Sequence, residues 1–181
     1  MNPRQGTILG AAFERLHPWD RMLYAHQATG APPRLPRAVT VRRLRSEDGP
    51  ALAAMDPSMS WIHATWGGPS GLASSGQGWA AFRKGRVLAL ACTRFAGSRY
   101  EDVACATAPS ERRRHLALAC VQGLTDDVIA RGRTATWSCS RAHRASRLLA
   151  WTAGFRLVRE YVHHTTRPVA VSNPSILRAA A

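Results

Sequence analysis

The stretch YEDVACATAPSERRRHLALACVQGLTDDVIARGRTATWSCSRAHRASRLLAWTAGF, from Tyr100 to Phe155, contains most of the information about the fold of this chain. Tyr100 to Thr107 has the composition of a strand, and Pro109 ends it. A long segment with helical periodicity follows, and then a second strand-like run from Thr134 to Ser138. A strand, a crossover helix and a strand of this length favour parallel pairing and an α/β layer fold.

Two helices are expected in this stretch. The first ends at Arg131-Gly132, a cationic last turn with a glycine stop, and its apolar face is formed by Ala117, Cys120, Val121, Leu124 and Val128. Ser140 is a candidate N-cap for the second helix, which ends at Gly154. One face of this second helix is formed by Ala145, Leu148, Leu149 and Thr152.

Three consecutive arginines, Arg112, Arg113 and Arg114, stand where the first helix is expected to begin. A helix start has unpaired backbone N–H groups and the positive end of the helix dipole, so arginines there would strengthen a site for an anion such as a phosphate. Taken alone, three arginines are also what a solvated surface carries. The strand and the helix on either side favour the phosphate site.

These residues resemble the GNAT N-acetyltransferase family. ERRRHLA is similar to the pyrophosphate loop of that family, with Arg112 at its first position and Ala117 at its final small residue, and SRLLAWTAGFRLVREY is similar to the closing helix and last strands. The resemblance covers roughly Val39 to Thr166. It implies one α/β domain with a mixed, mainly antiparallel sheet flanked by helices.

The resemblance also implies an acetyl-CoA-dependent transfer of an acetyl group to an unidentified amine. The residues that it assigns to the CoA site are Cys105, Thr107, Arg112, Arg113, Arg114, His115, Leu116, Ala117, His143 and Ser146. Three positions depart from the family pattern: His115 replaces a glycine, His143 replaces an asparagine and Ala150 replaces a tyrosine that acts as general acid. An alternative is therefore a CoA-binding module with weakened or lost catalysis.

Glu101 and Asp102 form the acidic pair closest to the expected cleft. Alternation along a strand sends them to opposite faces, so at most one faces the substrate. The resemblance favours Glu101 as the base that accepts the amine proton through water. The alternative is a strand-end carboxylate that pairs with a nearby arginine.

The segment from Trp61 to Gly78 is expected to be the least regular internal part of the chain. Its aromatic residues, Trp61, His63 and Trp66, could line the acceptor pocket, because aromatic side chains on loops often do so. The alternative is that the two tryptophans cover an edge of the core.

Cysteine and histidine positions predict no metal site. Cys92, Cys105, Cys120 and Cys139 show no paired spacing, which also argues against a disulfide framework. His163 and His164 alternate on a late strand, so one is expected in the core and one on the surface. Cys105 as an acyl-accepting nucleophile lacks a supporting sequence signature.

A length of 181 residues predicts one domain, and a formal charge of +14 favours anionic partners such as a nucleotide cofactor. The arginines are scattered without an RNA-reading aromatic motif, so a basic RNA-associated protein is only a third reading. No signal peptide or membrane-spanning run is visible, so a cytoplasmic location is expected.

Three regions are expected along the chain. Residues 1–38 form a helical arm, from Ile8 to Gln27, with a Pro-rich connection; residues 39–168 form the GNAT-like domain; residues 169–181 form a tail. The arm has an apolar face that could pack on the domain or pair two copies of the chain.

Overall fold

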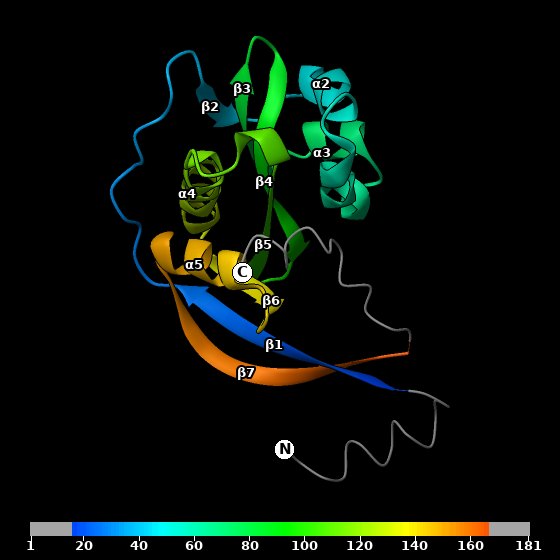
Figure 1. The fold of residues 1–181 in the computed structure, drawn as a ribbon, viewed down its shortest axis with the longest axis vertical. Coiled ribbons are helices and arrows are strands. Elements are labelled where there is room, and N and C mark those ends of the chain that lie inside the picture. Colours follow the sequence, from blue (N-terminus) through cyan, green and yellow to red (C-terminus); the bar gives the residue numbers. More distant parts are fainter. Residues whose placement is uncertain (1–15, 167–181) are drawn as a thin grey trace.

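Seven strands join into one sheet in the order β2-β3-β4-β5-β6-β1-β7 (Figure 1). The computed structural model describes residues 16–166. In chain order the elements are β1 (His17–His26), β2 (Thr40–Arg43), η1 (Ser46–Asp48), α2 (Gly49–Ala53), η2 (Pro57–Trp66), α3 (Pro69–Ser74), β3 (Gly78–Arg83), β4 (Arg86–Ala96), β5 (Tyr100–Thr107), η3 (Pro109–Glu111), α4 (Leu116–Ala130), β6 (Thr134–Ser140), α5 (Arg144–Thr152) and β7 (Phe155–Thr165).

The sheet is mixed and mainly antiparallel, as predicted. The neighbours β5 and β6 pair in parallel through the crossover helix α4, and the other neighbouring strands are antiparallel. The strands β3 and β4 form an antiparallel hairpin. Within residues 16–166, no helix combines the length and the apolar character needed to cross a membrane.

Helices cover both faces of the sheet (Figure 1). We call the side that packs on α4 and α5 the α4 face; Val103, Ala135 and Trp137 belong to its core. We call the other side the η2 face; Leu90 and Ala104 belong to its core, together with residues of α2, η2 and α3. Every residue of β4 from Val87 to Thr93 is buried, because this strand is covered on both faces.

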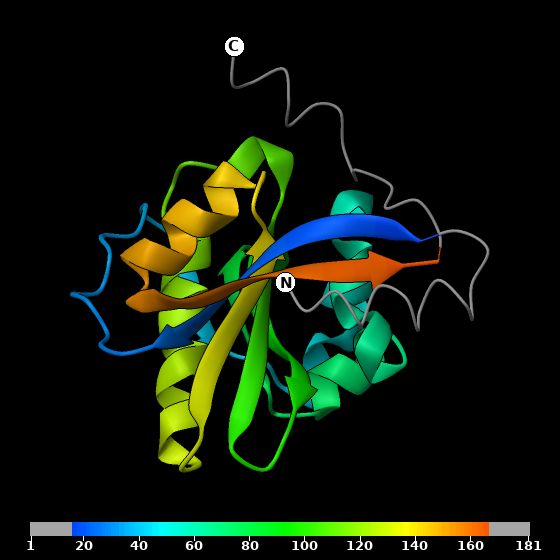
Figure 2. The same ribbon diagram turned by 90° about the horizontal axis from the view of Figure 1, so that it is seen from below.

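The predicted helical arm is wrong over residues 17–26, which form strand β1. The alternating burial of Met22 and Tyr24 matches a strand of period 2, and β1 pairs with β6 on one side and β7 on the other. Figure 2 shows β1 and β7 side by side. Residue 38 therefore does not separate an arm from the domain, and residues 1–15 of the predicted arm lie outside the described residues.

Four smaller predictions also need correction. The helix α5 begins at Arg144 with His143 as its N-cap, because Ser140 still belongs to β6. The face of α5 that contains Leu148 is largely exposed, and Ala150 and Ala153 are buried instead. The segment expected to be irregular contains η2 and α3. Both His163 and His164 are exposed, because β7 is an edge strand.

The turn from α5 into β7 depends on a glycine. Gly154 has a φ of 91°, and its carbonyl accepts a hydrogen bond of 3.1 Å from the N–H of Gln27, just after β1. A Cβ at this position would lie 1.7 Å from the carbonyl oxygen of Ala28. The glycine thus allows the α5–β7 turn to approach the end of β1.

We expect Gly154→Ala to lower the free energy of unfolding by at least about 2 kcal/mol, because it combines backbone strain with a clash against main-chain atoms. Gly132→Ala is the matched control: Gly132 also has a positive φ, 72°, but nothing lies within 4 Å of its added Cβ. It should cost only about 1–2 kcal/mol. Urea unfolding of both variants measures the difference, and equal losses would contradict the proposed close contact.

Candidate functional site

The parallel ladder between β5 and β6 ends early. It joins Tyr100, Glu101 and Asp102 to Thr134–Thr136, whereas β5 continues to Thr107 and β6 to Ser140. The C-terminal halves of the two strands therefore diverge. A strand edge that leaves its neighbour presents N–H and C=O groups that a ligand with amide groups can pair with.

A loop rich in arginine lies at the C-terminal end of β5. Arg113 and His115 both have a φ of 59°, and α4 starts at Leu116, so the three arginines precede the helix rather than form its first turn. The N–H of Ala119 reaches back to the carbonyl of His115 over 3.1 Å. The N–H groups of residues 116–118 lie before this bond, in the part of a helix that lacks intrahelical acceptors. This is the geometry of an anion site.

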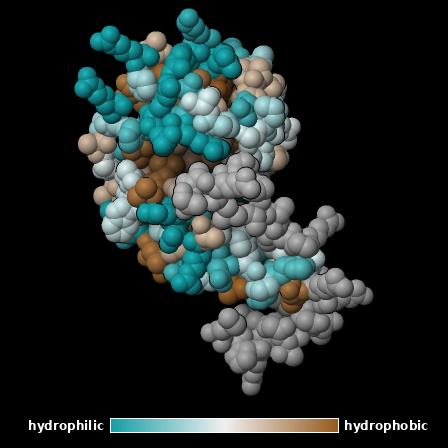
Figure 3. Space-filling view, viewed as in Figure 1, coloured by the Kyte–Doolittle hydropathy of each residue, from teal (hydrophilic) through white to brown (hydrophobic). Residues whose placement is uncertain are grey.

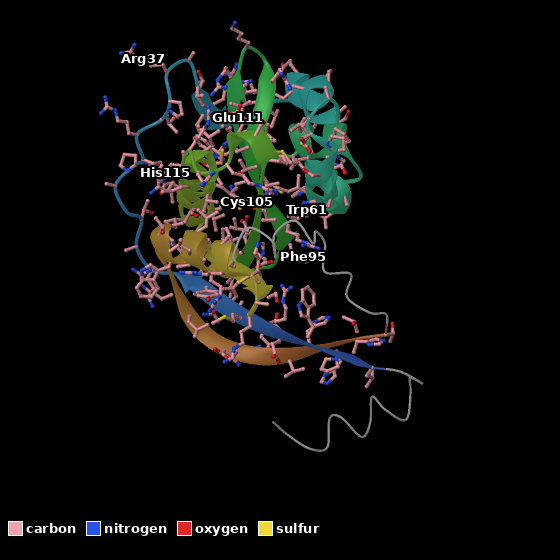
Figure 4. The ribbon with its side chains drawn as sticks, in the orientation of Figure 1. Arg37, Trp61, Phe95, Cys105, Glu111 and His115 are labelled. Atoms are coloured by element: carbon pink, nitrogen blue, oxygen red, sulfur yellow. The ribbon has the colours of Figure 1, made fainter. Side chains whose placement is uncertain are left out.

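The three arginines of this loop are all exposed but do not have equal surroundings. Glu111 receives ion pairs from Arg83, at 3.2 Å, and from Arg114, at 3.3 Å. Within residues 16–166, Arg112 and Arg113 take part in no ion pair. Their charges therefore remain available to an anion, whereas Arg114 is partly neutralised. Figure 4 shows Glu111 and His115 in this region.

The other wall of the gap is formed by β6 and the start of α5. Partial burial lowers the pKa of His143, and the positive charge of Arg112 lowers it further by a smaller amount. The charge of Arg112 is thus felt at the start of α5. Ser146 accepts a hydrogen bond of 3.0 Å from Nε1 of Trp137, so its hydroxyl ties α5 to β6. The structure thus brings Arg112 and His143 together and gives Ser146 a packing contact.

Glu101, predicted as the base, lies on the α4 face and is fully buried. Its carboxylate accepts hydrogen bonds from Arg131 at 2.7 and 2.9 Å, from Arg133 at 3.0 Å and from Thr93 at 2.6 Å. Burial alone would raise the pKa of Glu101, but these hydrogen bonds outweigh it and lower the pKa to about 2. A carboxylate held in this way is a poor proton acceptor, and the geometry favours an internal ion pair over catalysis.

Asp102, which was not the predicted base, lies on the opposite face of β5. Its side chain is partly exposed, and Thr136 on β6 donates a hydrogen bond of 3.3 Å to it. Burial raises the pKa of Asp102, and hydrogen bonds and nearby arginines only partly offset this. The alternation rule separated the two acidic residues correctly. The sequence did not reveal which of them would be clamped by arginines from the end of α4.

The three residues predicted to bind the acceptor have different environments. Trp61 is 47% exposed, and the Arg94 guanidinium lies 5.8 Å from its ring centroid. Trp66 donates a hydrogen bond of 2.8 Å from Nε1 to the carbonyl of Thr93, so it anchors η2 to β4. Nδ1 of His63 is buried without a hydrogen-bond partner among the described residues. Trp61 is therefore the best placed of the three to meet a ligand (Figure 4).

The thiol of Cys105 does not have the environment of a nucleophile. Burial raises its pKa to about 12, which keeps the thiol protonated at neutral pH. Within the described residues, no group of three or more His, Cys, Asp or Glu side chains is placed to hold a metal ion.

A hollow of about 340 Å³ at the end of β6 is lined by Pro18, Trp19, Asp20, Ser140, Arg141 and Ala142.

The family model described as GNAT acetyltransferase matches residues 16–164. The chain belongs to this family. Over 125 residues it is 56% identical to the "Uncharacterized N-acetyltransferase in mutA 5'region" of Streptomyces virginiae, a match that covers 68% of this chain. The chain spans about half the length of this relative, 53%.

Solved structures share the GNAT fold at low sequence identity. A GCN5-related N-acetyltransferase-like protein from Streptococcus suis matches with a TM-score of 0.66 and 16% identity, covering 90% of this chain and 68% of that one. A GNAT-family acetyltransferase from Colwellia psychrerythraea matches with a TM-score of 0.67 and 16% identity, covering 90% and 60%. The family match also includes β1, which the resemblance noted from the sequence did not.

In this GNAT domain, we expect Glu101→Gln to lower the free energy of unfolding at pH 7 by roughly 3–5 kcal/mol, because Arg131 and Arg133 lose a buried partner. The folded pKa of Glu101, about 2, is below its ordinary 4.5, so its stabilisation is complete above pH 4.5 and is lost as the pH falls toward 2. The variant should lack this part of the acid dependence.

Glu160→Gln is the control for that experiment. Glu160 pairs with Arg141 at 3.4 Å, and both side chains are exposed, so its loss should cost less than about 1 kcal/mol. Chemical denaturation from pH 2 to 7 measures both variants. If Glu101→Gln were as mild as Glu160→Gln, the Glu101 cluster would not be a stabilising element.

Proposed function

We propose that this protein is an acetyl-CoA-dependent N-acetyltransferase that transfers the acetyl group directly to an amine. The observation that carries the proposal is the divergence of β5 and β6 after Asp102, which opens toward the arginine loop at the start of α4. Membership of the GNAT family supports the same conclusion.

Each part of this gap suits a part of acetyl-CoA. Arg112, Arg113 and the N–H groups at the start of α4 would bind the phosphates, with His143 facing them from the start of α5. The exposed edge of β5 from Ala104 to Thr107 would pair with the amides of the pantetheine arm and polarise the thioester carbonyl. Cys105 would contribute its backbone here, because its thiol is protonated.

In direct transfer, the neutral amine attacks the thioester carbonyl. The C–N bond forms, the C–S bond breaks and the thiolate of CoA leaves. Ala150 is fully buried and has no proton to donate to this thiolate, so the proton comes from water. The amine must also lose a proton, which requires a base on the acceptor side.

A CoA-binding module without catalysis is the second candidate. His115 favours it, because this residue has a positive φ and carries a side chain where the loop would approach the phosphates. A β-carbon at this position restricts both the backbone and the space for the ligand. Binding and turnover must therefore be measured separately.

Saturating acetyl-CoA is expected to raise the melting temperature, since ligand at ~100 times its dissociation constant adds roughly 2.7 kcal/mol to the free energy of unfolding. Release of free CoA should follow when amines are added, and a thiol reagent detects it. Binding without release for a broad amine panel would favour the second candidate. If acetyl-CoA caused no thermal shift and produced no binding heat in calorimetry, the proposal would be overturned.

The role of His115 can be tested with two variants. If its side chain only obstructs the loop, His115→Gly should bind CoA more tightly than the wild type, because glycine tolerates a φ of 59°. His115→Ala, which removes the imidazole but keeps a Cβ, should improve binding less. If the imidazole instead donates to a phosphate, both variants should bind more weakly, by about 1–3 kcal/mol. Calorimetric dissociation constants separate the two cases.

A further inference from the structure

We propose that Asp102 is the general base that removes the proton from the acceptor amine, an inference that rests on the proposed acetyl transfer. Asp102 is the last residue of β5 in the ladder with β6, where it pairs with Thr136. Its carboxylate therefore lies at the point where the two strands begin to diverge. It is on the same strand whose edge from Ala104 onward, unpaired with β6, would bind the thioester.

The side chain of Asp102 points to the η2 face. Ala104, two residues later, belongs to the core of that face, whereas Glu101 and Val103 belong to the α4 face. Asp102 pairs with Phe95 of β4, and Phe95 is 61% exposed. On this side Trp61 and Phe95 lie near each other (Figure 4). In this assignment the acceptor approaches Asp102 from the side of Trp61 and Phe95, opposite to the contacts of α4.

Two arginines stand near Asp102 without forming an ion pair with it. Arg94 lies 5.8 Å from the ring of Trp61 and 5.5 Å from that of Phe95, and Arg21 lies 4.2 Å from the ring of Trp19. Both guanidinium groups thus lie close to aromatic rings, and their charges act on Asp102 without a direct ion pair. Asp102 differs in this respect from Glu101, whose oxygens are occupied by guanidinium groups.

The surroundings of Asp102 favour a carboxylate that is more basic than an ordinary aspartate. Burial raises its pKa; hydrogen bonds from Thr136 and Ser138 on β6, and the charges of Arg94 on β4 and Arg21 on β1, oppose the shift. The helix η2, which packs on β4 and β5, carries His63 as its titratable group. A base of raised pKa is better matched to proton transfer near neutral pH.

The proton balance of the reaction is complete with this assignment. As the amine nitrogen bonds to the carbonyl carbon it becomes strongly acidic, and the carboxylate of Asp102 accepts its proton, directly or through one water molecule. The intermediate then collapses, the C–S bond breaks and the CoA thiolate takes a proton from water. Asp102 returns its own proton to solvent, so the products are an N-acetyl amine and CoA.

The test compares wild type with Asp102→Asn, using a primary amine that the wild type accepts from a panel of amino acids, polyamines and aminoglycosides. We expect kcat to fall by about 100-fold to 10,000-fold, with an unchanged dissociation constant for acetyl-CoA. Asp102→Glu should recover part of the activity. Asp126→Asn is the control for the change in net charge, because Asp126 is an exposed residue of α4 outside the site.

The pH profile separates a catalytic role from a structural one. In the wild type, log kcat/KM should fall as the pH is lowered. The slope against pH should be about 1 where only the free amine becomes protonated, and about 2 below the pKa of Asp102, where both groups do. Asp102→Asn should keep a slope of about 1 throughout. Circular dichroism at each pH confirms that both proteins remain folded.

Each outcome decides the inference. Equal kcat and equal profiles for wild type and Asp102→Asn would overturn the role of Asp102 while leaving acetyl transfer in place. A variant that loses activity together with its melting transition, with no partial rescue by Asp102→Glu, would assign Asp102 to the structure. A wild type that neither binds acetyl-CoA nor releases CoA with any amine would overturn the proposed function and this inference with it.

Discussion

The buried carboxylate of Glu101 ties together the elements on which the site depends. Arg131, just after α4, and Arg133, just before β6, both bind it, and Thr93 donates to it from β4. Next to this cluster, the N–H of Thr134 bonds to the carbonyl of Arg99 over 2.9 Å. The starts of β5 and β6 are thus held together on the α4 face, and the strands are free to separate beyond Asp102.

The early end of the parallel ladder explains the layout of the site. Because β5 and β6 pair over only three residues, their far ends are not joined to each other, and these ends lead to the arginine loop and toward α5. The loop supplies positive charge at one end of the gap, and Asp102 supplies a carboxylate at the other. A long ligand with an anionic end and a reactive end matches this arrangement better than a small compact one.

The strand β1 forms a second constraint. It lies between β6 and β7, so the N-terminal part of the described chain completes the sheet next to the gap. Its residue Arg21, stacked on Trp19, reaches the surroundings of Asp102. On the face seen in Figure 3, hydrophilic residues are extensive and apolar patches are smaller.

The sequence alone determined the elements whose pattern is local. The apolar spacing from Ala117 to Val128 and the order of β5, α4 and β6 predicted the core of the fold, because helical and strand periodicities are properties of neighbouring residues. The arginine loop was predicted for the same reason. The structure places the three arginines before α4 rather than at its first turn, and the anion site itself stays a prediction.

Only the tertiary structure decided what depends on partners distant in the chain. Residues 17–26 form a strand because β6 and β7, more than a hundred residues later, offer two edges to pair with. Glu101 and Asp102 differ only by one position in sequence, yet one is clamped by Arg131 and Arg133 and the other faces the opening. Alternation predicted opposite faces, but it could not predict which face would carry the arginines. Those positions follow from the packing of α4 on the sheet, and side-chain contacts of that kind leave no local pattern in the sequence.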